Sequence, residues 1–113
     1  MVEYGKKLGN FQRFKGATAE DLEAMIRDFD GRFGIKVDMG DNQNGGPTLG
    51  NVIEVLKKYG GYASGYIIYS PRDDARITVD TVVIPEKAIF ELDNVVNPDD
   101  VWREGGMVGM WWD

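Results

Sequence analysis

The sequence predicts an α+β fold: a two-layer sandwich in which two amphipathic helices pack on one face of a mostly antiparallel sheet of four to five strands. Three observations support this class. Two segments repeat apolar residues at helical spacing, and several shorter segments are rich in β-branched and aromatic residues. The turns between the latter are short, which favours antiparallel pairing. With 113 residues, 42% of them apolar, the chain suits a single domain over residues 1–113.

Both helices have recognisable start and stop signals. The first is expected over residues 18–31, because the Thr18 hydroxyl can cap the backbone N–H of Asp21 and Gly31 can end the helix. The second is expected over residues 48–59, where Gly60 supplies the stop. The apolar stripes are Leu22, Met25, Ile26 and Phe29 in the first helix, and Leu49, Val52, Ile53 and Leu56 in the second.

Strands are expected between and after the helices. Residues 33–39 alternate apolar and polar side chains, as a half-buried strand does, and a polar, Gly-rich loop follows at 40–47. A meander of three further strands is predicted after the second helix. An N-terminal strand is weaker, because its two phenylalanines do not alternate. The meander is expected at 62–70, 76–84 and 88–93, and the N-terminal strand at 10–15.

The charge is unevenly distributed along the chain. Thirteen basic and nineteen acidic residues give a net charge of −6. Residues 1–15 carry a net charge of +3, whereas residues 86–113 carry −5. Within that acidic region, residues 94–113 form an acidic, Trp-rich C-terminal extension of the domain.

The chain contains no histidine and no cysteine. This excludes Ser-His and Cys-His nucleophiles and removes the usual zinc ligands, so we predict no catalytic residue, no metal site and no cofactor. Carboxylate chemistry is the remaining catalytic option. Asp38 and Asp41 beside the 38–48 loop, and Asp28 and Asp30 in the first helix, are its candidates. Each of them also has an ordinary place on a solvent-facing surface or in a turn.

Four tyrosines occur close together at residues 59, 62, 66 and 69. Tyrosine presents a rigid apolar ring with a polar tip and is enriched at binding surfaces. Strand alternation places Tyr62 and Tyr66 on one face and Tyr69 on the other. Tyr62 and Tyr66 are therefore candidate partner-binding residues, and packing at the edge of the core is the alternative role for them.

The C-terminal extension contains the other candidate partner-binding residues. Tryptophan and methionine supply anchors for a partner, and carboxylates steer a basic surface towards them. Alternatively, Trp111 and Trp112 fold back to cover the open face of the sheet. The candidates in the extension are Asp99, Asp100, Trp102, Glu104, Met110, Trp111 and Trp112.

We therefore expect a non-catalytic protein-binding module, of the inhibitor, immunity or phage-type antagonist kind. Its acidic surface and aromatic anchors would meet a basic surface on another protein. One alternative is a structural or assembly subunit that self-associates through its C-terminal tail as a homo-oligomer. Another is a small-ligand or carboxylate-based enzyme domain that uses the 38–48 loop.

The same composition bears on other partners and on location. A net negative charge repels nucleic-acid phosphates, so we do not expect nucleic acid as a partner. No apolar run approaches the length of a membrane span, and the N-terminus has no apolar signal segment. We expect a cytoplasmic protein with no membrane contact.

Overall fold

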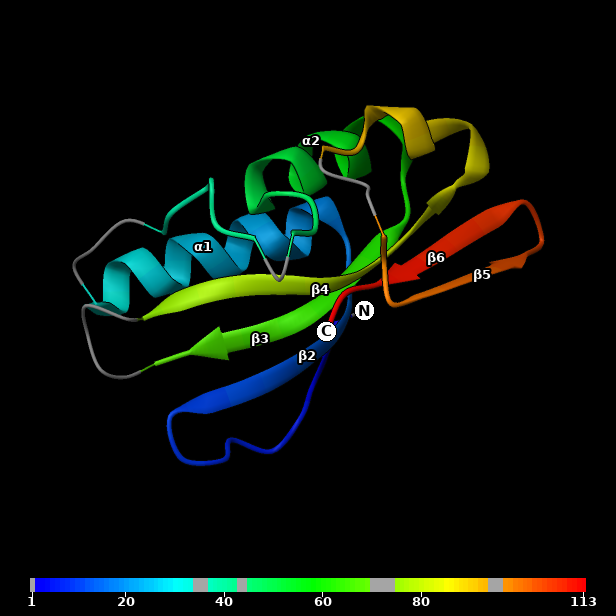
Figure 1. Cartoon of the computed structure of the whole chain (residues 1–113). Coiled ribbons are helices and arrows are strands. Elements are labelled where there is room, and N and C mark those ends of the chain that lie inside the picture. The colour runs from blue at the N-terminus through cyan, green and yellow to red at the C-terminus, as the bar shows by residue number, and fades with distance from the viewer. Residues whose placement is uncertain (1, 34–36, 43–44, 70–74, 94–96) are drawn as a thin grey trace.

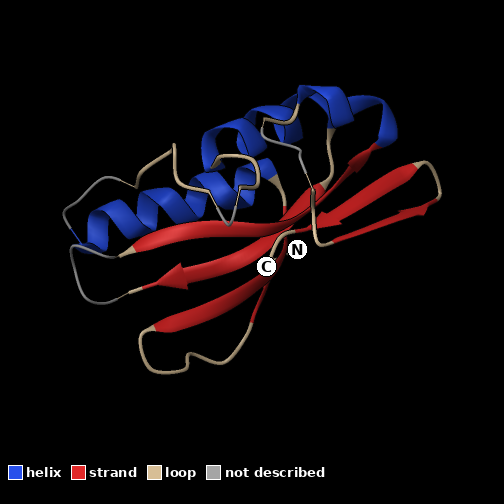
Figure 2. Cartoon of the chain, viewed as in Figure 1, coloured by secondary structure: helices blue, strands red, loops and turns tan. Residues whose placement is uncertain are grey.

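The computed structural model describes residues 2–33, 37–42, 45–69, 75–93 and 97–113. The fold is α+β, with one antiparallel sheet and helices on one of its faces (Figures 1 and 2). None of the helices in the described part of the chain combines the length and the apolar character that a membrane span requires.

The sheet has six strands in the order β1-β2-β3-β4-β6-β5, one more than the upper bound predicted from the sequence. Every neighbouring pair is antiparallel. The strands are β1 (Glu3–Tyr4), β2 (Phe11–Ala17), β3 (Tyr62–Ile68), β4 (Arg76–Pro85), β5 (Asp100–Glu104) and β6 (Met107–Trp111). The weak N-terminal strand and the first two strands of the meander are therefore confirmed, with small differences at their ends.

The helices begin where their caps predict. In α1 (Ala19–Phe33), Thr18 Oγ1 accepts the N–H of Asp21, and an Asp21 carboxylate oxygen accepts the N–H of Thr18. In α2 (Leu49–Tyr59), Thr48 Oγ1 accepts the N–H of Asn51. Each cap satisfies a backbone donor that has no partner inside the helix, which fixes the first turn.

Two predictions near the end of α1 are wrong. The helix continues through Gly31 to Phe33, since a single glycine inside an exposed helix costs only about 1 kcal/mol. Phe33 is thus helical, and residues 37–39 of the expected strand form no strand; residues 34–36 lie outside the described residues. Val37 is buried, and its N–H donates to the Asp30 carboxylate at 2.9 Å instead of to a neighbouring strand.

The expected strand at 88–93 is also wrong. The chain forms a 3-10 helix there, η2 (Glu86–Glu91), which buries Ala88 and leaves Phe90 77% exposed. Short apolar runs fit either periodicity, so spacing alone does not separate the two. The place beside β4 is taken instead by β6, from the C-terminal extension.

The extension is a β-hairpin that forms one end of the sheet. Gly105 and Gly106, with φ of 58° and 81°, make the two-residue turn between β5 and β6. After β6 the chain continues into the core, where Trp112 is 1% exposed. The hairpin is therefore an integral part of the fold.

The core lies between the helices and the sheet. It receives the helical stripes predicted from the sequence together with alternate residues of the strands. Its largest fully buried side chains include Phe14, Leu22, Leu49, Ile77, Ile84, Met110 and Trp112. In the described part of the chain, no helix lies against the opposite face of the sheet (Figure 2).

Candidate protein-binding surface

Strand alternation decides which side chains point away from the helices. Val82 and Met110 are register partners and are fully buried in the core, so their neighbours Val83 and Trp111 point to the other side. We call this helix-free side of the sheet the open face. Two candidates on β3, Tyr62 and Tyr66, lie on it as alternation predicts, because Tyr62 is the register partner of Val83.

One row of the open face crosses four strands and begins and ends with an exposed aromatic residue. Tyr62 is 44% exposed and Trp102 is 40% exposed, and their strands are separated by two others. Their backbones are therefore about 14 Å apart. The row consists of Tyr62 in β3, Val83 in β4, Gly109 in β6 and Trp102 in β5.

A groove of about 280 Å³ follows this row. Val83 is only 8% exposed and, with Gly109, lies between the two aromatic residues. Glu104 and Met107 also contribute to the walls. We call it the aromatic groove; its lining is Tyr62, Val83, Trp102, Glu104, Gly105, Met107 and Gly109.

Gly109 explains how Trp102 lies in this groove. A Cβ atom on Gly109 would overlap Cε2, Cζ2 and Nε1 of the Trp102 indole. The indole therefore covers the glycine backbone in the neighbouring strand, a contact that any larger residue at position 109 prevents. Gly109 thus sets the position of the Trp102 ring across the sheet, and with it the shape of the groove.

The charge beside the groove is negative. Glu104 is exposed, and among the described residues its carboxylate makes no hydrogen bond or ion pair. Arg103 points to the other side of β5, where its Nε donates to Glu86 at 2.8 Å, so it leaves Glu104 uncompensated. Asp100 lies on the open face as the register partner of Trp111. A cationic group entering the groove would therefore meet an available carboxylate.

The other candidates in the extension separate into exposed and buried groups. Trp111 is 37% exposed on the open face, whereas Met110 and Trp112 are buried in the core at 0% and 1%. Asp99 is exposed, and its carboxylate accepts the N–H of Asp113 at 2.6 Å. The alternative, in which Trp111 and Trp112 both cover the open face, is wrong for Trp112, which lies in the core with Met110. Trp102 and Trp111 are on the open face.

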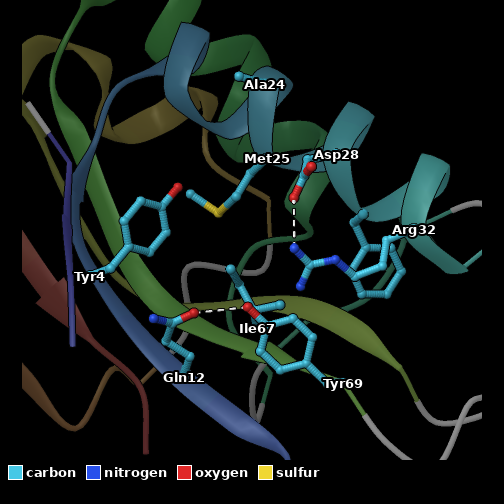
Figure 3. A pocket seen from close by; sticks show the side chains of 9 residues that line it. Tyr4, Gln12, Ala24, Met25, Asp28, Arg32, Ile67 and Tyr69 are labelled. Atoms are coloured by element: carbon cyan, nitrogen blue, oxygen red, sulfur yellow. Dashed lines mark hydrogen bonds and ion pairs between the residues drawn. The ribbon is translucent and has the colours of Figure 1, made fainter. Parts of the chain in front are cut away.

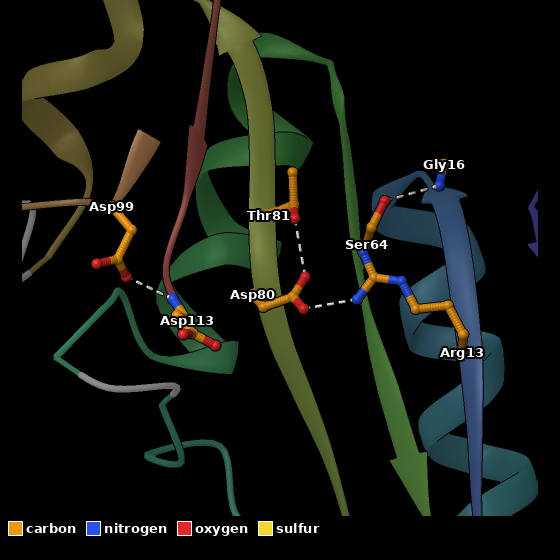
Figure 4. A network of polar contacts seen from close by, with 7 residues as sticks. All are labelled: Arg13, Gly16, Ser64, Asp80, Thr81, Asp99 and Asp113. Carbon is orange, nitrogen blue, oxygen red and sulfur yellow. Dashed lines mark hydrogen bonds and ion pairs between the residues drawn. The ribbon is translucent and has the colours of Figure 1, made fainter. Parts of the chain in front are cut away.

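Tyr66 belongs to a second aromatic group on the open face. Its ring meets that of Phe11 edge to face, with centroids 5.9 Å apart. The Arg13 guanidinium lies 4.9 Å from the Tyr66 centroid and bonds to the Asp80 carboxylate at 2.6 Å (Figure 4). Ser64 lies between Tyr62 and Tyr66 in β3, and its hydroxyl accepts the N–H of Gly16. Tyr62 and Tyr66 therefore share a face but belong to different groups.

The carboxylates considered for catalysis have structural roles. Asp38 accepts the N–H of Gly40 in a turn, and Asp28 pairs with Arg32 one helical turn later. Burial raises the pKa of Asp41, an effect that the nearby Arg76 opposes at 3.7 Å. Within the described part of the chain, no three carboxylates gather closely enough to hold a metal ion.

The sequence did not point to Val83 or Gly109 as groove residues. The available signal was the Gly105-Gly106 pair between two apolar runs, which is typical of a hairpin turn. Pairing the residues across that turn places Gly109 opposite Trp102.

Comparisons with protein-family models, with curated proteins and with solved structures found no significant match for this chain.

Proposed function

We propose that the protein is a non-catalytic binding module of the inhibitor, immunity or phage-type antagonist kind. Its open face receives a basic protein, and a lysine or arginine side chain of that partner enters the aromatic groove. The observation that carries this function is the arrangement of Tyr62, Trp102 and Glu104 around one groove.

The chemistry of the groove supports a cationic side chain. Aromatic rings attract an ammonium or guanidinium group across their faces, by about 0.5–2 kcal/mol depending on how far the group is desolvated. The aliphatic stem of lysine or arginine can lie over Val83 and Gly109. Glu104 supplies the counter-charge, and the net charge of −6 increases the rate of encounter with a basic partner. The same charge disfavours nucleic acid. We also expect the protein to carry out this function in the cytoplasm.

Affinity capture from the source cell, followed by titration of the purified partner, tests this function. The wild-type protein is expected to retain a basic partner that the Trp102→Ala and Glu104→Gln variants lose. Phe90→Ala is the matched control, because Phe90 is an exposed aromatic residue of η2, outside the groove. Titration should show a loss of about five- to tenfold or more for Trp102→Ala, the range expected when an interface anchor is truncated.

Three outcomes would contradict this function. One is equal retention of the partner by wild type and Trp102→Ala. Another is a similar loss of affinity for the partner in the Phe90→Ala control. The third is a partner with an acidic surface. Trp112→Ala is unsuitable as a probe, because Trp112 is a core residue.

One observation favours self-association as a second function. β5 is an edge strand of five exposed residues, and Val101 and Trp102 are 41% and 40% exposed. An exposed edge with apolar side chains is a template for pairing with another copy. If the chain assembles in this way, light scattering should give a discrete oligomer that Val101→Lys converts to monomer; a monomer at high concentration in the wild type would exclude it.

A further inference from the structure

A second cavity lies on the helix side of the sheet, between α1 and the β1-β2-β3 end (Figure 3). Its volume is about 430 Å³, within the range of roughly 300–1,000 Å³ that is typical of small-molecule sites. Met25 and Phe29 of α1 and Ile67 of β3 form its inner wall, and each is at most 6% exposed. The inner part of the cavity is therefore apolar and can receive a hydrocarbon group.

Polar side chains surround the apolar part. Tyr69 donates its hydroxyl hydrogen to Oε1 of Gln12 at 2.8 Å, which fixes both groups at one side. The Tyr4 hydroxyl points towards Met25 in Figure 3. Burial, followed by the nearby charge of Asp21, raises the pKa of Tyr4. Like any tyrosine hydroxyl near neutral pH, this group is protonated and can donate a hydrogen bond. These groups can orient the polar end of a ligand.

Two cations lie near the Tyr69 ring, and one of them, Arg32, lines the cavity. Lys7 Nζ is 4.4 Å from the centroid of the Tyr69 ring, and the Arg32 guanidinium is 5.6 Å from it. The carboxylate among the lining residues is Asp28, whose side chain is 76% exposed and lies 3.7 Å from Arg32. An exposed pair at this distance contributes little to stability, so Arg32 can turn towards a ligand at small cost.

From this arrangement we propose that the cavity binds a small organic carboxylate with an apolar body. The hydrocarbon part lies against Met25, Phe29 and Ile67, and the carboxylate lies beside Arg32, the cation among the lining residues. The site is on the opposite side of the sheet from the aromatic groove. It therefore does not depend on the protein-binding function proposed for the open face.

Three probes of equal chain length test the preference for an anion: octanoate, octan-1-ol and octyltrimethylammonium. Titration calorimetry or NMR shift mapping of the whole chain is expected to give a dissociation constant for octanoate of about 1 mM or below. Octanol should bind about five- to tenfold more weakly, because it lacks the charge-assisted contact with Arg32. Absence of octanoate binding, or equally tight binding of the cationic probe, would overturn the site.

Two variants with a matched control locate the ligand. Arg32→Gln should weaken octanoate about five- to tenfold and leave octanol almost unchanged. Arg27→Gln removes the same charge from an exposed position of α1 outside the cavity and should have no effect. Ala24→Phe places a ring at the exposed edge of the cavity without altering the core, and should weaken both octanoate and octanol.

Each result decides one part of the assignment. Equal weakening by Arg32→Gln and Arg27→Gln would show a general charge effect and overturn the role of Arg32. Full binding by Ala24→Phe would overturn the cavity as the site. Trp102→Ala should bind octanoate like wild type, so loss of protein binding and loss of carboxylate binding are distinguishable. Circular dichroism and thermal unfolding of each variant separate a binding defect from a folding defect.

Discussion

At the scale of single residues, the ion pair between Arg13 and Asp80 joins a partly exposed cation to a buried carboxylate. Asp80 is 6% exposed in the middle of β4, and one of its carboxylate oxygens receives Arg13 at 2.6 Å. The other oxygen accepts the Thr81 hydroxyl at 2.8 Å. Arg13 itself keeps contact with solvent, because its side chain is 27% exposed. The two partners therefore respond differently to loss of the other.

We predict that Arg13→Met destabilises the fold more than Asp80→Asn. Arg13→Met leaves a buried carboxylate without its cation, which typically costs about 3–5 kcal/mol. Asp80→Asn leaves a partly hydrated guanidinium and keeps the contact with Thr81, for a cost of about 1–2 kcal/mol. Urea unfolding of both variants and of the double variant measures the difference. Equal losses would show that the burial of Asp80 does not decide how much each substitution destabilises the fold.

A second residue-scale prediction concerns pH. Burial raises the pKa of Asp41 in the folded state, so folding favours its protonated form. The stability from this group is fully present below the pKa of the unfolded chain and is lost as pH rises through the higher folded pKa. Asp41→Asn stays neutral throughout. Its unfolding free energy relative to wild type should therefore increase between about pH 3 and pH 7, as followed by urea unfolding. A constant or declining difference would contradict the raised pKa.

At the scale of elements, the strand glycines Gly65 and Gly109 are required for different reasons. A Cβ on Gly65 in β3 would overlap the backbone carbonyl of Thr78 in β4, and the backbone there cannot move without separating the strands. At Gly109, the three atoms nearest to an alanine Cβ all belong to the Trp102 ring, and a side-chain ring can rotate away more easily than a backbone can move. Gly65 thus allows β3 and β4 to pair closely, and Gly109 allows the Trp102 ring to lie over the neighbouring strand.

Gly65→Ala is therefore expected to be the more destabilising substitution, by about 3 kcal/mol or more, at the upper end of typical overpacking costs. Gly109→Ala should cost about 1 kcal/mol and mainly change the environment of Trp102. Thermal unfolding measures the first effect, and tryptophan fluorescence the second. A Gly109→Ala variant with an unaltered spectrum would show that the indole does not depend on the glycine.

The elements that sequence could predict are those specified by local residues. The caps Thr18 and Thr48 mark the helix starts, and runs rich in β-branched and aromatic residues mark β3 and β4. The failures at 33–39 and 88–93 arise where a short apolar pattern fits more than one structure and tertiary contacts decide. Asp30 takes the N–H of Val37, and burial of Ala88 fits η2 as well as a strand.

The site was predictable to a similar extent. Alternation alone placed Tyr62 and Tyr66 on one face of a strand. Whether Trp111 or Trp112 is buried depends on the pairing of β6 with β4, a contact between segments far apart in the sequence. The groove also needs Val83, which no local pattern distinguishes from other strand valines. The sequence therefore predicted which residue types contribute to the site better than which of them lie together in the fold.

At the scale of the whole molecule, the sheet separates two surfaces of different chemistry. The open face carries the aromatic groove with Glu104, and the helix side carries the apolar cavity with Arg32 in its lining. The C-terminal hairpin contributes to the open face and to the core at once, so the two cannot be separated by truncation.

Deletion of residues 107–113 is therefore expected to unfold the protein instead of merely removing a binding tail. It removes β6, separates β5 from β4, and takes Val108, Met110 and Trp112 out of the core. Loss of three such side chains amounts to about 5–10 kcal/mol, comparable to the entire stability of a typical domain. Urea unfolding followed by circular dichroism should show no cooperative transition. Deletion of Asp113 alone is the control and should cost about 1 kcal/mol, because it removes one contact with Asp99. A cooperative transition in the longer deletion would mean that the helices and the β1-β4 strands fold without the hairpin.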